Sequence, residues 1–115
     1  EEALALTEKE KFNLAAFHLE QACQLWLKYL ILKKIGDFPK THYFHELVRA
    51  FAEAYDDKRF LDFYQENELF FDDLEDAYFT SRYHPKTFSR NLVKILSDSS
   101  RRLISLTEEI VGESF

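Results

Sequence analysis

The chain has 115 residues, of which 46% are apolar and 31% charged, and this composition excludes a disordered protein. No run approaches the roughly 18 apolar residues that a membrane span needs, so no membrane partner is expected. The formal net charge of −6 argues against broad nucleic-acid binding, although a local basic patch can still bind a phosphate group. Cys23 is the only cysteine, which excludes an intramolecular disulfide and favours a reducing, cytoplasmic setting.

The first predicted helix runs from about Thr7 to Ile35. Apolar residues recur along it at intervals of three and four, which is typical of a buried helical face. Thr7 and Glu10 fit a capping box at its start, and Gly36 followed by Pro39 predicts its end. Further apolar residues widen the face, so we expect this helix to be covered on more than one side.

Three more helical segments follow, over residues 42–55, 58–80 and 90–111. Thr41 is predicted to open the first of them, and Ser89 is predicted to cap the last. A polar stretch at 65–68 predicts a bend or break in the middle segment. With only two glycines and two prolines, the sequence predicts few turns and one all-α domain over residues 1–115. The expected architecture is an antiparallel up-and-down bundle of four or five helices.

The sequence contains little evidence for a metal site, a catalytic nucleophile or a glycine-rich phosphate-binding loop. His42 and His45 lie three positions apart beside Glu46, but two ligands on one helical turn need others from elsewhere. Cys23 lies within an apolar helix face, where a thiol ordinarily serves as packing. The two glycines are too far apart to form a phosphate-binding loop, so we expect no metal, no cofactor and no catalytic residue of these kinds.

An acidic cluster precedes the last connection of the chain and consists of Asp72, Asp73, Glu75 and Asp76. One interpretation is a solvated helix face. The other is an acidic surface that receives a basic partner.

The connection before the last helix combines positive charge with aromatic rings. Its candidate ligand-binding residues are Arg82, Tyr83, Lys86, Ser89 and Arg90. Tyr83 and Phe88 offer faces on which a base can stack, and the first amides of the last helix can receive a phosphate at its positive end. The alternative is an ordinary turn in which Arg82 pairs with nearby acids, the rings fill the end of the bundle and Pro85 only breaks the helix.

Segments 13–47 and 74–90 together resemble the HEPN family, a nucleotide-binding domain of higher eukaryotes and prokaryotes, and most of all its short stand-alone archaeal and bacterial members. The clearest pieces are Glu20-Gln21-Ala22, Lys40-Thr41-His42, Ala77-Tyr78 and Ser81-Arg82-Tyr83. The resemblance implies a helical bundle that is often a homodimer and that binds a nucleotide such as ATP. It also implies a partnership with a small nucleotidyltransferase in a toxin–antitoxin-like pair.

Many members of that family are metal-independent ribonucleases. Their motif is an arginine, usually followed by a polar residue, with a histidine five to seven positions after the arginine. Positions 87–89 after Arg82 and positions 95–97 after Arg90 contain no histidine. The expected function is therefore a non-catalytic module that binds a nucleotide or a nucleotidyltransferase. A dimeric ribonuclease and a structural homodimer without a ligand are the alternatives.

Overall fold

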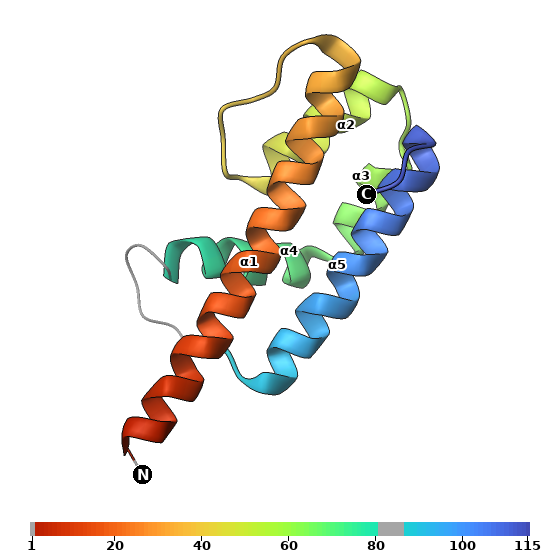
Figure 1. The fold of residues 1–115 in the computed structure, drawn as a ribbon. Helices are drawn as coiled ribbons and strands as arrows, with labels where there is room; N and C mark the ends of the chain where they lie inside the picture. Colours follow the sequence, from red (N-terminus) through yellow and green to blue (C-terminus); the bar gives the residue numbers. More distant parts are fainter. Residues whose placement is uncertain (1, 81–86) are drawn as a thin grey trace.

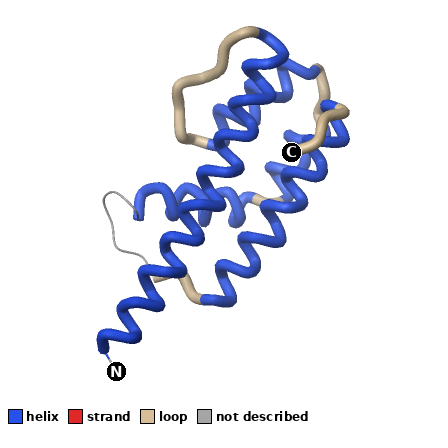
Figure 2. The backbone as a smooth tube through the Cα atoms, viewed as in Figure 1, coloured by secondary structure: helices blue, strands red, loops and turns tan. Residues whose placement is uncertain are grey.

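A computed structural model describes residues 2–80 and 87–115, with side chains described from residue 8 onward. The described chain folds into five helices joined by connections, without strands (Figures 1 and 2). They are α1 (Glu2–Ile35), α2 (Phe44–Tyr55), α3 (Arg59–Glu66), α4 (Glu68–Thr80) and α5 (Arg90–Val111). The predicted all-helical bundle is thereby confirmed. None of these helices, as far as they are described, is long and apolar enough to cross a membrane.

The two longest helices, α1 and α5, lie side by side and run in the same direction (Figure 1). The first half of α1 contacts the beginning of α5, and residues further along α1 contact residues further along α5. The backbone N–H of Phe88 donates to Asn13 Oδ1 at 2.9 Å, and Trp26 Nε1 donates to Thr107 Oγ1 at 2.9 Å. From the end of α1 to the start of α5, the chain passes through α2, α3 and α4 in turn, and α4 crosses α1 in Figure 1. This path brings the start of α5 beside the first half of α1.

Local signals set several helix boundaries as predicted. Ser89 caps α5, because its hydroxyl oxygen accepts the backbone N–H of Leu92 at 3.0 Å. Gly36 follows α1 with φ of 81°, a conformation that glycine adopts without steric cost. The predicted break in the middle segment falls at Asn67, between α3 and α4, where the Asn67 side-chain amide donates to the carbonyl of Phe63 at 2.8 Å.

Two predicted helix starts are wrong. α1 already begins at Glu2, so position 7 lies inside the helix and not at its N-cap position. Residues 3–6 are alanine and leucine, which favour helix and carry it past the expected start. α2 begins at Phe44 rather than at His42. Thr41 precedes the helix, and its hydroxyl accepts the backbone N–H of Tyr43 at 3.1 Å.

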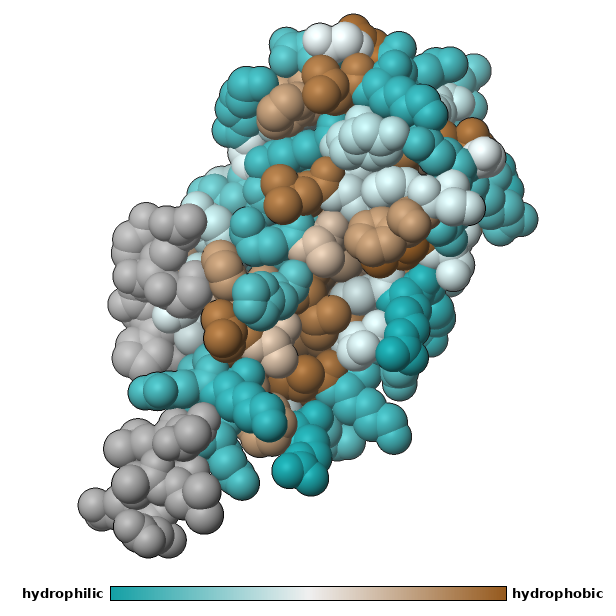
Figure 3. Space-filling view, in the orientation of Figure 1, coloured by the Kyte–Doolittle hydropathy of each residue, from teal (hydrophilic) through white to brown (hydrophobic). Residues whose placement is uncertain are grey.

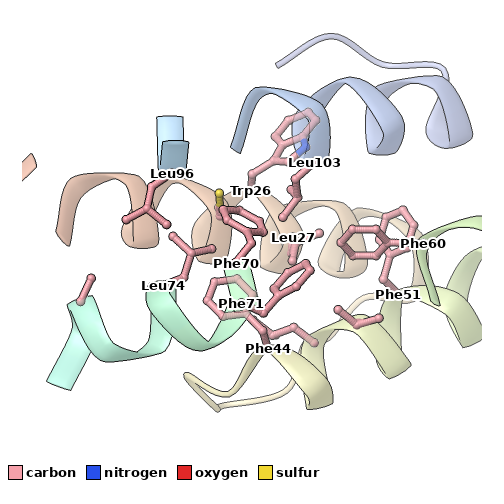
Figure 4. Close-up of a cluster of buried hydrophobic side chains, with 14 of the residues drawn as sticks. Trp26, Leu27, Phe44, Phe51, Phe60, Phe70, Phe71, Leu74, Leu96 and Leu103 are labelled. Carbon is pink, nitrogen blue, oxygen red and sulfur yellow. The ribbon is translucent and has the colours of Figure 1, made fainter. Parts of the chain in front are cut away.

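Phenylalanine rings form the centre of the core (Figure 4). Phe44, Phe51, Phe60 and Phe71 are fully buried or nearly so, and they come from α2, α3 and α4. The rings of Phe51 and Phe60 meet edge to face at a centroid distance of 5.1 Å, which is a favourable geometry for aromatic pairs. Each buried phenylalanine contributes about 1.5–3 kcal/mol of transfer free energy. Much of the aromatic content of the sequence therefore stabilises the bundle.

The central helix α1 packs against α2, α4 and α5, which confirms that it is covered on more than one side. One stripe nevertheless stays exposed. Leu25, Tyr29 and Leu32 are 58%, 45% and 43% exposed. The space-filling view shows apolar side chains at the surface among polar ones on this side of the molecule (Figure 3). The outward stripe of α1, made of these three residues, is thus a partly exposed apolar surface, on which the C-terminal segment contacts only the Tyr29 hydroxyl, through the Glu113 carboxylate at 2.7 Å among the described residues.

Candidate functional site

The start of α5 carries the two predicted ligand-binding residues that the structure describes, Ser89 and Arg90. Arg82, Tyr83 and Lys86, the other three, lie outside the described residues. Ser89 is exposed, and its hydroxyl accepts the capping bond from Leu92 but can still donate its own hydrogen to a ligand. No acidic residue lies in the first turn of α5, so the positive end of the helix dipole is not neutralised within that turn.

Arg90 is exposed and lies against the opposite helix. Its guanidinium carbon is 5.7 Å from the centroid of the Phe12 ring in α1, within reach of a cation–π interaction. Within residues 8–80 and 87–115, Arg90 forms no ion pair. The charge is therefore held near the N-terminus of α5 by an aromatic ring, with its hydrogen-bond donors open to an anion.

Phe88 does not offer a stacking face, contrary to one of the two interpretations of the connection. Its side chain is only 1% exposed and belongs to the core. Its ring therefore fills the end of the bundle, as the turn interpretation expected. The backbone of Phe88 has a different role, because its N–H is fixed by Asn13 of α1.

A cavity of about 220 Å³ adjoins this region and was not anticipated from the sequence. It is lined by Glu10, Asn13, Leu14, Phe17 and Thr80. Four of these residues follow helical spacing on α1, and the fifth ends α4. Asn13 joins the cavity to the start of α5 through its bond with Phe88. The i, i+3, i+4, i+7 spacing could have identified the α1 wall, but only the tertiary fold adds Thr80.

A buried carboxylate lies at the centre of a second polar cluster. Glu20 is fully buried, and it accepts hydrogen bonds from Gln21 Nε2 at 2.7 Å and Gln24 Nε2 at 2.5 Å. Burial raises the pKa of Glu20, and the two glutamine bonds oppose this rise. Lys28 Nζ donates to Gln24 Oε1 at 2.6 Å, so residues at i, i+4 and i+8 form a ladder along α1.

Residues before α2 extend this second cluster. Lys40 Nζ is 3.6 Å from the ring centroid of Phe38, and Lys28 Nζ is 6.0 Å from the same centroid. His42 stacks on Tyr78 of α4 at 4.3 Å and 14°, and its Nε2 atom is buried without a hydrogen-bond partner among the described residues. Three of the segments that resemble the HEPN family are therefore linked by side-chain contacts between α1, the connection before α2, and α4. They are the segments that contain Glu20, Lys40 and Tyr78.

The predicted acidic cluster is divided between solvent and the protein interior. Asp72 and Asp76 are exposed, whereas Glu75 is half-buried and accepts the backbone N–H of Phe44 at 3.0 Å. Burial raises the pKa of the Glu75 carboxyl, and its bond to Phe44 opposes the rise. Glu75 therefore contributes to the fold, and no local sequence pattern points to this role.

Two other sequence predictions concern His45 and Cys23. His45 is exposed beside Glu46, and in the described part of the chain no group of three or more His, Cys, Asp or Glu side chains could hold a metal ion. Cys23 is fully buried, and burial raises the pKa of its thiol to about 11. At neutral pH the thiol is protonated, so the predicted packing role of Cys23 is confirmed.

A model of the HEPN domain family matches residues 1–112 of the 115 residues. No curated protein and no solved structure matches the chain.

Proposed function

The chain belongs to the HEPN domain family, and on that premise we propose that it is a non-catalytic module that binds the phosphates of a nucleotide at the start of α5. The observation that carries the proposal is the exposed Arg90 beside a helix N-terminus whose first turn contains no acidic residue. Arg82, Tyr83 and Lys86, which lie outside the described residues, would supply two further charges and an aromatic face.

Calorimetric titration of ATP and GTP into the protein, with and without magnesium, tests this proposal. Arg90→Ala should weaken binding about tenfold, because a charge-assisted hydrogen bond to phosphate is lost. Arg101→Ala is the matched control, since Arg101 is an exposed arginine of the same helix that lies 3.8 Å from Asp98. Absence of heat at millimolar nucleotide, or equal loss in both variants, would exclude this site.

The non-catalytic assignment is supported by the residues that follow Arg90. Position 96, where a ribonuclease of this family could carry its histidine, is a fully buried leucine of the core. Positions 95 and 97 are isoleucine and serine, and neither accepts a proton at neutral pH. Arg90-Asn91 is nevertheless half of the ribonuclease motif, so RNA should be incubated with the protein in the presence of a chelator. Cleavage that Arg90→Ala abolishes would favour the ribonuclease.

We also propose that two copies associate through the outward stripe of α1. Apolar residues that are exposed together on one helix face mark an interaction surface more often than isolated ones do. Leu25→Glu should shift the molar mass measured by sedimentation from dimer to monomer. Leu69→Glu is the control, because Leu69 is 80% exposed on a different helix, α4. A dimer that survives Leu25→Glu would place the interface elsewhere.

The family membership further supports a small nucleotidyltransferase as the protein partner in a toxin–antitoxin-like pair. Co-expression of the chain with a nucleotidyltransferase encoded beside it, followed by affinity purification, tests the pairing. A stable complex would support the proposal, and two proteins that purify separately would contradict it.

A further inference from the structure

The cavity between α1 and the end of α4 has the size and lining of a nucleobase site. Its volume of about 220 Å³ is below the roughly 300–1,000 Å³ of pockets that hold whole drug-sized ligands. Leu14 and Phe17 provide apolar walls, and Phe17 provides a ring on which a base can stack. Glu10, Asn13 and Thr80 add polar groups. We infer that this cavity binds the guanine base of the nucleotide, an inference that rests on the nucleotide-binding function proposed above.

Glu10 is the residue that selects the base. Its side chain is exposed on α1 and makes no hydrogen bond or ion pair with any other residue whose side chain is described. A carboxylate is a pure acceptor with two oxygens side by side, and it pairs best with two parallel N–H donors. Guanine offers such a pair on its Watson–Crick edge, in N1–H and the exocyclic 2-amino group.

The other bases fit this carboxylate less well. Adenine and cytosine each place a ring-nitrogen acceptor beside their amino group, and that lone pair would face a carboxylate oxygen. Uracil offers a single N–H between two carbonyl oxygens. Hypoxanthine keeps N1–H but lacks the 2-amino group, so inosine nucleotides remove one of the two bonds and leave the rest of the base unchanged.

Asn13 supplies the complementary donor. Its Oδ1 is engaged by the backbone N–H of Phe88 at 2.9 Å, which fixes the orientation of the carboxamide. The Nδ2 group is thereby left as a donor, and guanine O6, the acceptor next to N1–H, is its natural counterpart. Glu10 and Asn13 are three residues apart on α1, so they lie on the same face of the helix.

The same residue joins the base site to the phosphate site. Asn13 binds Phe88, and Phe88 immediately precedes the two residues, Ser89 and Arg90, that begin α5. Phe12, the neighbour of Asn13, carries the Arg90 guanidinium on its ring. A guanine nucleotide would therefore bind across the junction of α1 and α5, with its base on the α1 side.

Calorimetric titration of GTP, ITP and ATP into the full chain tests the inference. GTP should bind at least about tenfold more tightly than ATP, with ITP between them, because hydrogen bonds to a charged group are worth a factor of about ten or more. Glu10→Gln should remove the preference for GTP, since an amide replaces one acceptor by a donor. Glu8→Gln is the matched control, because Glu8 is an exposed glutamate of the same helix outside the cavity.

The outcomes separate this inference from the proposed function. Equal binding of GTP and ATP that still depends on Arg90 would overturn the guanine site and leave nucleotide binding in place. Loss of the GTP preference in both glutamine variants would also overturn it. If no nucleotide binds, both proposals fail. Thermal unfolding of Glu10→Gln should match that of the wild type, since the side chain is exposed.

Discussion

Glu75 of α4 caps α2 from a distance of 31 positions in the chain, because its carboxylate accepts the backbone N–H of Phe44 at 3.0 Å. Tyr43, at the N-cap position of α2, makes no side-chain capping bond of its own. A helix start leaves backbone N–H groups without partners inside the helix, and Glu75 satisfies one of them. The bond also ties α4 to α2 near the place where His42 stacks on Tyr78.

Replacement of this cap should destabilise the fold. Glu75→Ala is expected to lower the free energy of unfolding by about 1 kcal/mol, the usual loss for a helix cap, as measured by urea denaturation. Glu75→Gln keeps an acceptor oxygen and should lose less. Asp72→Ala, an exposed acid of the same helix, should change stability by under about 0.5 kcal/mol. Equal effects of the two alanine variants would show that the cap contributes nothing.

The buried carboxylate of Glu20 should make stability depend on pH. Its folded-state pKa lies above the ordinary value of 4.5, so the folded protein binds this proton more tightly than the unfolded chain does. The stabilising contribution of that proton is complete below pH 4.5 and is lost as the pH rises through the raised folded-state pKa. Wild type should therefore lose stability relative to Glu20→Gln as the pH rises toward 7.

Urea denaturation of both proteins at several pH values between 4 and 7 measures this difference. The comparison isolates Glu20 together with its small electrostatic coupling to Glu75, because contributions from the exposed acids are common to both proteins and cancel. A constant difference in unfolding free energy across the range would contradict the assigned pKa direction.

Local sequence predicted most of the helices and the two described site residues at the start of α5, but it did not predict the cavity beside them. Ser89 and Gly36 act on their own helix ends, so a short window contains all the information needed for α5 to start and for α1 to stop. The start of α2 depends on Glu75, which no local window includes. The cavity likewise needs Thr80 of α4 beside α1, and the burial of Phe88 depends on the packed core. Tertiary contacts decide these features.

The only tryptophan of the chain reports on a buried hydrogen bond. Trp26 Nε1 donates to Thr107 Oγ1, and the Thr107 hydroxyl in turn donates to a backbone carbonyl of α5, with Leu103 O at 3.0 Å and Ile104 O at 2.9 Å. Thr107→Val keeps the shape but leaves the indole N–H unpaired, which should lower stability by about 1–3 kcal/mol. Thr107→Ser retains the hydroxyl and is the control. Urea denaturation gives the loss, and a change in the Trp26 emission maximum should accompany it only in the valine variant.

Cys23 should resist thiol reagents in the folded protein. It is fully buried, so a reagent cannot reach the sulfur in the folded state. Burial also raises the pKa of its thiol to about 11, so little of the reactive thiolate is present at neutral pH. A chromogenic disulfide reagent should label it slowly in buffer and rapidly in urea. Because labelling then requires opening of the structure, its rate should rise in the destabilised Thr107→Val protein and stay near the wild-type rate in Thr107→Ser. Fast labelling of the native wild type would show that α1 and α5 separate far more readily than the buried Trp26–Thr107 bond implies.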